Sequence, residues 1–151
     1  MSRDRTGLSL VLRFDGSVRY GPDNAEPQSA AVGYVVSAGG PLVEGSRALS
    51  TFVSSTHVEF RALVAGARAV AALARHRAVA AVHVRGDAAA VVEAVDPDHS
   101  ALPGDRIRQR RVETVREALA PIPRVTYRRV GRATNERAHA LATRAHGPAM
   151  G

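Results

Sequence analysis

The sequence has 151 residues, 45% of them hydrophobic, which is the size of one domain with one core. We therefore expect a single domain over 1–151, with frayed ends at 1–7 and 147–151. The absence of cysteine excludes disulfides and thiolate metal sites, so a bound metal would have carboxylate or imidazole ligands. Such ligands favour hard cations such as Mg²⁺ or Mn²⁺.

Charge is strongly biased towards arginine. All 21 basic residues are arginine, and the formal net charge is +7. A GC-rich genome explains the lack of lysine, but a surplus of cations also predicts a polyanionic partner, because phosphate backbones release counterions when they bind cations.

The sequence contains no run of 18 or more apolar residues, so no membrane partner is expected. The first residues, MSRDRTG, lead into a strand-like segment without the apolar region of a signal peptide. We therefore expect a cytoplasmic protein.

Alternating polarity predicts three strands in the first third of the chain. The first spans residues 8–15, and the others lie within 30–40 and 42–49. Four apolar residues alternate along the first strand: Leu8, Leu10, Leu12 and Phe14. The short connections predict an antiparallel meander.

Helical periodicity begins after this meander. The expected helices span residues 57–77, 88–95, 105–119 and 134–145, and the expected strands span 78–87 and 124–130. Four residues of the third helix should face inward: Ile107, Val112, Val115 and Leu119. The order β-β-β-α-β-α-α-β-α predicts an α/β fold, a mixed sheet with helices on its faces.

Three acids stand where folding does not require a carboxylate. Asp15 ends the first strand, Glu59 lies near the start of the first helix on its buried stripe, and Asp87 ends the fourth strand. If strands one and four are neighbours, the three acids converge at one edge of the sheet. Converging carboxylates repel unless cations bridge them, and two divalent ions so placed catalyse phosphodiester hydrolysis.

Each acid also has a purely structural interpretation. Asp87 could cap the helix that follows it, Glu59 could stabilise its helix dipole, and Asp15 could begin a turn. Asn135 could cap the last helix together with Thr134. The three acids together, in this element order, favour the metal site.

Four segments resemble the signature segments of type 1 ribonuclease H, in the order of that family. They are RFDGS at 13–17, HVEFRAL at 57–63, VRGDAAAVV at 84–92 and NERAHALATRA at 135–145. The resemblance implies a compact family member without the basic protrusion, in which antiparallel strands one to three join parallel strands four and five. It also implies a two-metal site for Mg²⁺ or Mn²⁺.

The same resemblance assigns catalytic and metal-binding roles to Asp15, Glu59, Asp87 and His139. His139 stands where the family usually has a fourth acid. It shares a helix face with Asn135, four residues earlier, and from spacing alone could be a ligand, a general base or solvent-facing surface. A neutral imidazole brings no negative charge, so we expect weaker binding of the second ion and better function with Mn²⁺ than with Mg²⁺.

Candidate substrate-binding residues lie in or near these segments and in the arginine run DRIRQRR at 105–111. They are Gly16, Ser17, Ser55, Thr56, Arg110, Arg111, Arg132 and Asn135. The chain departs from the family pattern in the hydroxyl residues before Glu59, in the DAA that begins at Asp87, and in a shortened loop where Arg132 is the nearest polar group. The arginines at 110 and 111 are either phosphate contacts or a solvated helix face.

The function that the resemblance implies is an endoribonuclease that cuts the RNA strand of an RNA/DNA hybrid by two-metal-ion hydrolysis. One alternative is a binding domain that kept the fold and lost the reaction. Another is a nuclease of the same fold that acts on double-stranded RNA. No coiled-coil pattern is present, so we expect a monomer.

Overall fold

Five strands form one mixed sheet in the computed structural model, which describes residues 7–20, 27–50, 54–98 and 106–146. In chain order they are β1 (Leu8–Tyr20), β2 (Pro27–Ser37), β3 (Pro41–Leu49), β4 (Val79–Gly86) and β5 (Arg124–Arg129). The order across the sheet is β3-β2-β1-β4-β5. β2 runs antiparallel to β1 and β3, whereas β4 is parallel to β1 and β5. The predicted topology is confirmed, and of the predicted frayed ends 1–6 and 147–151 lie outside the described residues.

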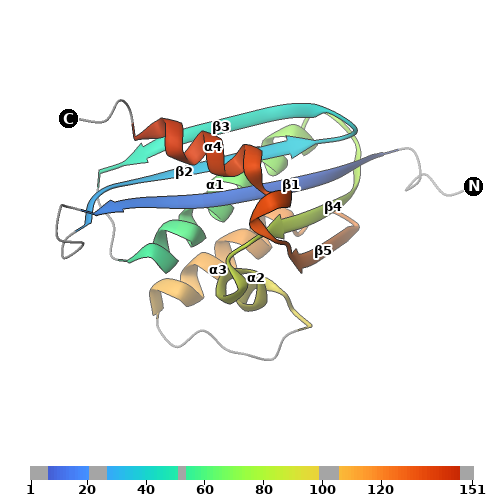
Figure 1. The fold of residues 1–151 in the computed structure, drawn as a ribbon. Helices are drawn as coiled ribbons and strands as arrows, with labels where there is room; N and C mark the ends of the chain where they lie inside the picture. The colour runs from blue at the N-terminus through green and yellow to red at the C-terminus, as the bar shows by residue number, and fades with distance from the viewer. Residues whose placement is uncertain (1–6, 21–26, 51–53, 99–105, 147–151) are drawn as a thin grey trace, which may run out of the picture.

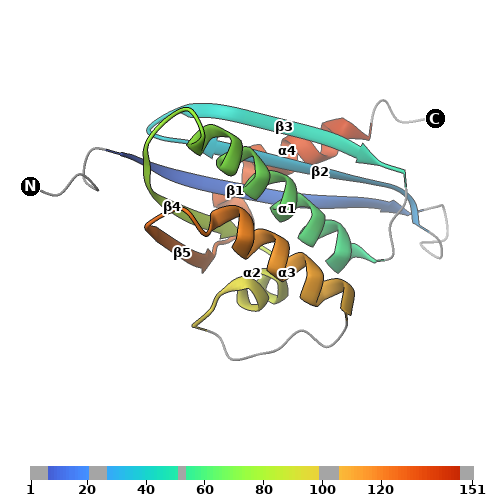
Figure 2. The same cartoon turned by 180° about the vertical axis from the view of Figure 1, so that it is seen from behind.

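Helices cover both faces of this sheet (Figures 1 and 2). They are α1 (Ser55–Ala74), α2 (Ala89–Val95), α3 (Arg106–Leu119), the short 3-10 helix η2 (Arg132–Thr134) and α4 (Glu136–Ala145). α1 packs against β1 and β2 and contacts α3, which runs beside it, while α4 packs against β1, β2 and β3 from the opposite face. No helix in the described ranges has the length and apolar character needed to span a membrane.

The central strand β1 supplies the core through its even-numbered residues. Leu10, Leu12 and Phe14 are fully buried, as the predicted alternation requires. A smaller apolar cluster of Val35, Ala138 and Leu141 lies between β2 and α4. The odd-numbered residues of β1 therefore point towards the α4 side of the sheet.

Close packing of α4 depends on a glycine in β2. A Cβ at Gly33 would lie 2.5 Å from the carbonyl oxygen of Ala138 and 2.5 Å from the amide nitrogen of Ala142. Only a glycine allows the backbones of α4 and β2 to approach this closely. This contact fixes the height of α4 above the sheet.

Two predicted details are wrong. β1 continues to Tyr20 rather than ending at Asp15, because residues 16–20 pair with β2. Ile107 was expected to face inward but is 47% exposed, because burial along α3 begins only at Val112.

The start of the last helix also differs from the prediction. α4 begins at Glu136, and the preceding residues form η2, in which the Thr134 hydroxyl donates to the Gly131 carbonyl. Asn135 precedes α4 but makes no side-chain cap bond. Asn135 therefore occupies the N-cap position without the side-chain bond that its structural interpretation required.

Candidate active site

Three carboxylates converge where β4 ends beside β1. Asp15 comes from β1, Glu59 from α1 and Asp87 from the residue after β4, and one oxygen of each lies within 4.8 Å of the others. β1 and β4 are parallel neighbours paired at Arg13 and Arg85, so Asp15 and Asp87, two residues further on, lie level with each other. We call these three residues the acid cluster.

Glu59 reaches the cluster because Gly16 lets α1 lie against β1. A Cβ at Gly16 would lie 2.9 Å from the Glu59 amide nitrogen and 2.9 Å from Cγ1 of Val58. The Gly16 backbone also hydrogen-bonds to the Glu59 side chain. Gly16, predicted to bind substrate, thus positions a helix against the central strand.

Burial and mutual repulsion make the acid cluster costly to ionise. Asp15 is only 1% exposed, and burial raises its pKa, an effect that a hydrogen bond from His139 opposes. Burial and the nearby charge of Asp15 raise the pKa of Glu59 to about 9. Without a compensating cation, Glu59 therefore retains its proton at neutral pH.

The donor set of the acid cluster fits a hard divalent cation. Oδ1 of Asp15 and Oε2 of Glu59 are both buried and have no hydrogen-bond partner. Buried polar atoms normally have hydrogen-bond partners, so two carboxylate oxygens without one in the same cluster point to a missing partner. Oxygen ligands are those that Mg²⁺ and Mn²⁺ prefer.

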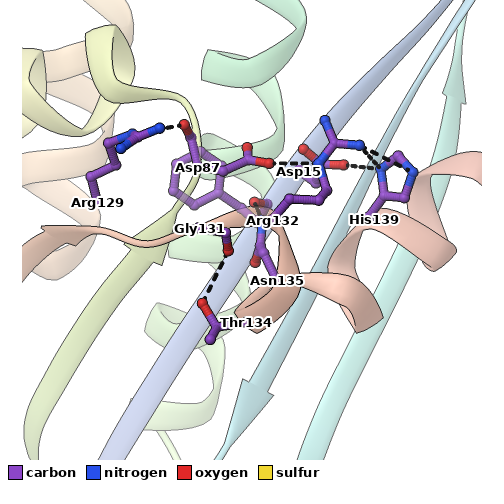
Figure 3. A network of polar contacts seen from close by, with 9 residues as sticks. Asp15, Asp87, Arg129, Gly131, Arg132, Thr134, Asn135 and His139 are labelled. Atoms are coloured by element: carbon purple, nitrogen blue, oxygen red, sulfur yellow. Dashed lines mark hydrogen bonds and ion pairs between the residues drawn. The ribbon is translucent and has the colours of Figure 1, made fainter.

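His139 lies beside the acid cluster (Figure 3). Its Nδ1 is 2.7 Å from Oδ2 of Asp15, and its side chain is 40% exposed. The imidazole therefore orients Asp15 in this structure. A role for His139 as a metal ligand stays a prediction.

Arg132 lies between Asp87 and His139 (Figure 3). Its Nε donates to Oδ2 of Asp87 at 2.9 Å, and its Nη1 lies 3.4 Å from each ring nitrogen of His139. Arg129, which sequence reasoning missed, donates to the Asp87 carbonyl at 3.4 Å. The guanidinium of Arg132 thus places a positive charge at the cluster.

Two predicted substrate-binding residues make contacts within the protein. Asn135 is completely buried, and its amide donates to the Phe14 carbonyl at 2.9 Å, so it ties α4 to β1 and cannot reach a substrate. The Ser17 hydroxyl contacts Nε2 of His146 at 2.9 Å, and Nδ1 of the same ring contacts the Ser29 hydroxyl at 2.7 Å. Sequence reasoning missed His146, although its position seven residues after His139 places both on one helix face.

The other predicted substrate-binding residues lie on the helices α1 and α3. Ser55 and Thr56 are in the first turn of α1, one turn before Glu59. Arg110 is exposed on α3, and Arg111 lines a cavity of about 410 Å³ with residues of α1, β2 and β3. Neither arginine belongs to the acid cluster.

The structural interpretation of Asp87 as a helix cap is wrong, because the N-cap of α2 is Ala88, which makes no side-chain cap bond.

Comparisons with known proteins agree with this architecture. Residues 13–145 match the model of a family described as reverse transcriptase-like. No curated protein matches the sequence.

Several solved structures are similar over nearly the whole chain. Ribonuclease H1 from the halophilic archaeon Halobacterium salinarum is 29% identical, with a TM-score of 0.77 over 93% of this chain and 99% of that one. The N-terminal ribonuclease H domain of a Mycobacterium tuberculosis protein is 23% identical, with a TM-score of 0.77 over 91% of this chain and 93% of that one.

The third similar structure contains nucleic acid. The ribonuclease H1 designated LC11, isolated from compost, was solved in complex with an RNA/DNA hybrid. It is 18% identical, with a TM-score of 0.76 over 90% of this chain and 95% of that one, a likeness in fold. The match over residues 13–145, the strand order and these structures agree, and the chain belongs to the reverse transcriptase-like family as a ribonuclease H family member.

Proposed function

We propose that the protein is an endoribonuclease that cleaves the RNA strand of RNA/DNA hybrids by two-metal-ion hydrolysis. The observation that carries this proposal is the acid cluster, whose three carboxylates have oxygens within 4.8 Å of one another in a ribonuclease H family member. Recognition would depend on duplex shape and the ribose 2′-hydroxyl rather than on base sequence. The proposed products carry 5′-phosphate and 3′-hydroxyl ends.

Asp15, Glu59 and Asp87 would hold the divalent cations, Mg²⁺ or Mn²⁺. When bound, such ions supply activation of a water molecule and neutralisation of charge on the phosphate and the departing oxygen. Asp15 is held by His139, so one of its oxygens is oriented while the other, buried and without a partner, is available as a ligand. Asp87 is more accessible than Asp15, with a side chain that is 14% exposed against 1% for Asp15.

Arg132 would release the carboxylate of Asp87 and bind a substrate phosphate in its place. Its side chain is 63% exposed, so the guanidinium can turn away from Asp87 at little cost. Arginine stays protonated at neutral pH and therefore cannot be a general base. Its proposed role is to neutralise phosphate charge beside the acid cluster.

One observation favours the alternative of a non-catalytic nucleic-acid-binding domain. In this structure Asp15 and Asp87 each contact a basic side chain, His139 and Arg132, so protein groups already compensate part of the cluster's negative charge. A domain that had lost catalysis would need this compensation permanently.

Cytoplasmic location and the monomeric state stay predictions.

Cleavage of an end-labelled RNA/DNA hybrid with Mg²⁺ or Mn²⁺ tests the proposal. The wild-type protein is compared with Asp87→Asn and with Asp98→Asn, which makes the same charge change at an exposed position outside the cluster. We expect wild type and Asp98→Asn to cut only the RNA strand and Asp87→Asn to be inactive. Hybrid binding without cleavage by any of the three would support the binding domain, and preferential cutting of double-stranded RNA would replace the proposed substrate.

A further inference from the structure

Three arginines form one row across β1, β4 and β5. Arg13 of β1 is in register with Arg85 of β4, and Arg85 is in register with Arg128 of β5. Neighbouring strands lie roughly 4.8 Å apart, and residues in register point to the same face. We call Arg13, Arg85 and Arg128 the arginine row.

The arginine row lies on the sheet face opposite α1. Val82 and Val84 are fully buried in the core, so Arg85 points to the other side of β4. On that side α4 packs on β1, β2 and β3, and Figure 1 shows most of β4 and β5 without a helix in front of them. Arg128 is exposed, and Arg13 and Arg85 are half-buried.

No carboxylate in the described part of the chain forms an ion pair with any residue of the arginine row. Arg13 donates to the Thr134 carbonyl, and Arg85 donates to the Val84 carbonyl and the Thr126 hydroxyl. These neutral acceptors orient the guanidinium groups without neutralising them. Burial and the charges of Arg128 and Arg13 lower the pKa of Arg85.

This arrangement is unfavourable in the protein alone. Like charges directly opposite each other on neighbouring strands are destabilising. A bound anion would remove the repulsion, and forked guanidinium donors match the oxygens of phosphate. The arginine row is therefore complementary to a polyanion.

The arginine row continues directly from the acid cluster. Arg13 precedes Asp15 by two residues on β1, and Arg85 precedes Asp87 by two residues at the end of β4, a separation of roughly 7 Å along each strand. The same spacing appears in the sequence as Arg-Phe-Asp and Arg-Gly-Asp. A nucleic acid held at the acid cluster would therefore have further phosphates near the row.

We propose that the arginine row binds backbone phosphates of the nucleic acid that occupies the acid cluster. The inference extends the substrate surface to a sheet face outside the cluster, and it rests on the proposed function for the nature of the ligand. Nucleic acid is favoured over an acidic protein segment because the row adjoins the acid cluster on two shared strands.

Fluorescence anisotropy with a short RNA/DNA hybrid in EDTA tests this proposal, because without metal no cleavage takes place. The test variant is Arg85→Gln/Arg128→Gln, and the control is Arg75→Gln/Arg77→Gln, two exposed arginines that follow α1. We expect the test variant to bind on the order of tenfold more weakly at about 50 mM salt, and its salt slope to fall by about two. The control should keep wild-type affinity and slope.

Thermal unfolding separates binding from folding. The double variant should be at least as stable as wild type, because two like charges are removed. If the double variant unfolds at a lower temperature than wild type, the single variant Arg128→Gln is used, because that side chain is exposed. This variant must still lower the salt slope of hybrid binding by about one.

Equal affinity and slope in wild type and test variants would overturn the proposal, as would absence of hybrid binding by wild type. Loss of binding to a polyglutamate peptide with unchanged hybrid binding would also overturn it, in favour of a protein partner. If the variants lose hybrid binding but wild type with metal cuts no hybrid, the proposed function fails and the arginine row stands as a nucleic-acid site.

Discussion

Nδ1 of His139 lies 2.7 Å from Oδ2 of Asp15 and joins α4 to the central strand at the acid cluster. The partner of Asp15 is therefore an imidazole, which is neutral or positively charged. Because no fourth acid stands at this position, the cluster contains three carboxylates rather than four. The charge available for two divalent cations is correspondingly smaller.

His139→Asp should lower the metal concentration needed for cleavage. A fourth carboxylate adds negative charge and a hard ligand, so we expect the Mg²⁺ or Mn²⁺ concentration for half-maximal cleavage to fall on the order of tenfold. The same variant should unfold at a lower temperature in EDTA, because it places a second carboxylate opposite Asp15. His139→Asn is the uncharged control, and an unchanged or raised metal requirement in His139→Asp would contradict the prediction.

The metal-free protein should lose stability as pH rises. Glu59 has a folded-state pKa of about 9 against an ordinary value of 4.5, so its contribution is fully present below 4.5 and is lost as pH rises through about 9. Between these values the slope should approach about 1.4 kcal/mol per pH unit for this one proton. Denaturant unfolding in EDTA at several pH values measures the slope, which Glu59→Gln should reduce. Identical slopes in both proteins would exclude Glu59 as the cause.

Arg132→Gln should tighten metal binding. The guanidinium competes for Oδ2 of Asp87 at 2.9 Å, and its positive charge opposes a divalent cation. Isothermal titration with Mn²⁺ should therefore give a Kd several-fold lower than that of wild type, while hybrid binding weakens. Arg129→Gln is the matched control, because Arg129 contacts the backbone carbonyl of Asp87 and not its carboxylate. Weaker metal binding by Arg132→Gln would show that the guanidinium supports the site.

Gly16→Ala should damage both folding and the site. A Cβ at this position meets the Glu59 backbone nitrogen at 2.9 Å, so α1 must shift, at a cost of roughly 1–3 kcal/mol. Because α1 carries Glu59, metal affinity and cleavage should fall as well. Gly131→Ala provides the control, since its Cβ would have no atom within 4 Å. Wild-type stability and activity in Gly16→Ala would show that the close approach is unnecessary.

Reversing the charge of two α3 residues, in Arg110→Glu/Arg111→Glu, should weaken hybrid binding and make it less dependent on salt concentration. Arg110 is exposed on α3, and two phosphate contacts would contribute about two to the salt slope. The comparison is Arg75→Glu/Arg77→Glu, which makes the same change in net charge after α1. If both double variants lose the same affinity, net charge alone explains binding and this pair is not a contact surface.

The strands and the acid cluster could be predicted because each depends on local pattern. Leu10, Leu12 and Phe14 alternate, and their burial follows from that period. Asp15 and Asp87 end predicted strands that a parallel pairing makes neighbours, and Glu59 continues a buried helical stripe. The fold class followed from these patterns, whereas the placement of strand four beside strand one, on which the convergence of the acids depends, was an assumption that the resemblance to ribonuclease H supported.

Contacts of single side chains could not be predicted in the same way. Asn135 and Ser17 look like exposed polar residues in the sequence, but α4 lies directly on the sheet at Gly33 and brings Asn135 to Phe14 and His146 to Ser17. That approach is set by tertiary packing. The arginine row was missed for a related reason, since cross-strand register depends on how whole strands pair.

The acid cluster joins parts of the chain that a parallel crossover connection brings together. β1, β2 and β3 are consecutive antiparallel strands, which can pair locally, whereas β1 and β4 are parallel and are joined through α1. Asp15 and Asp87 can therefore face each other only after this crossover has formed and β4 has joined the sheet. A cation held by the three carboxylates would therefore tie β1, α1 and the end of β4 together across this crossover.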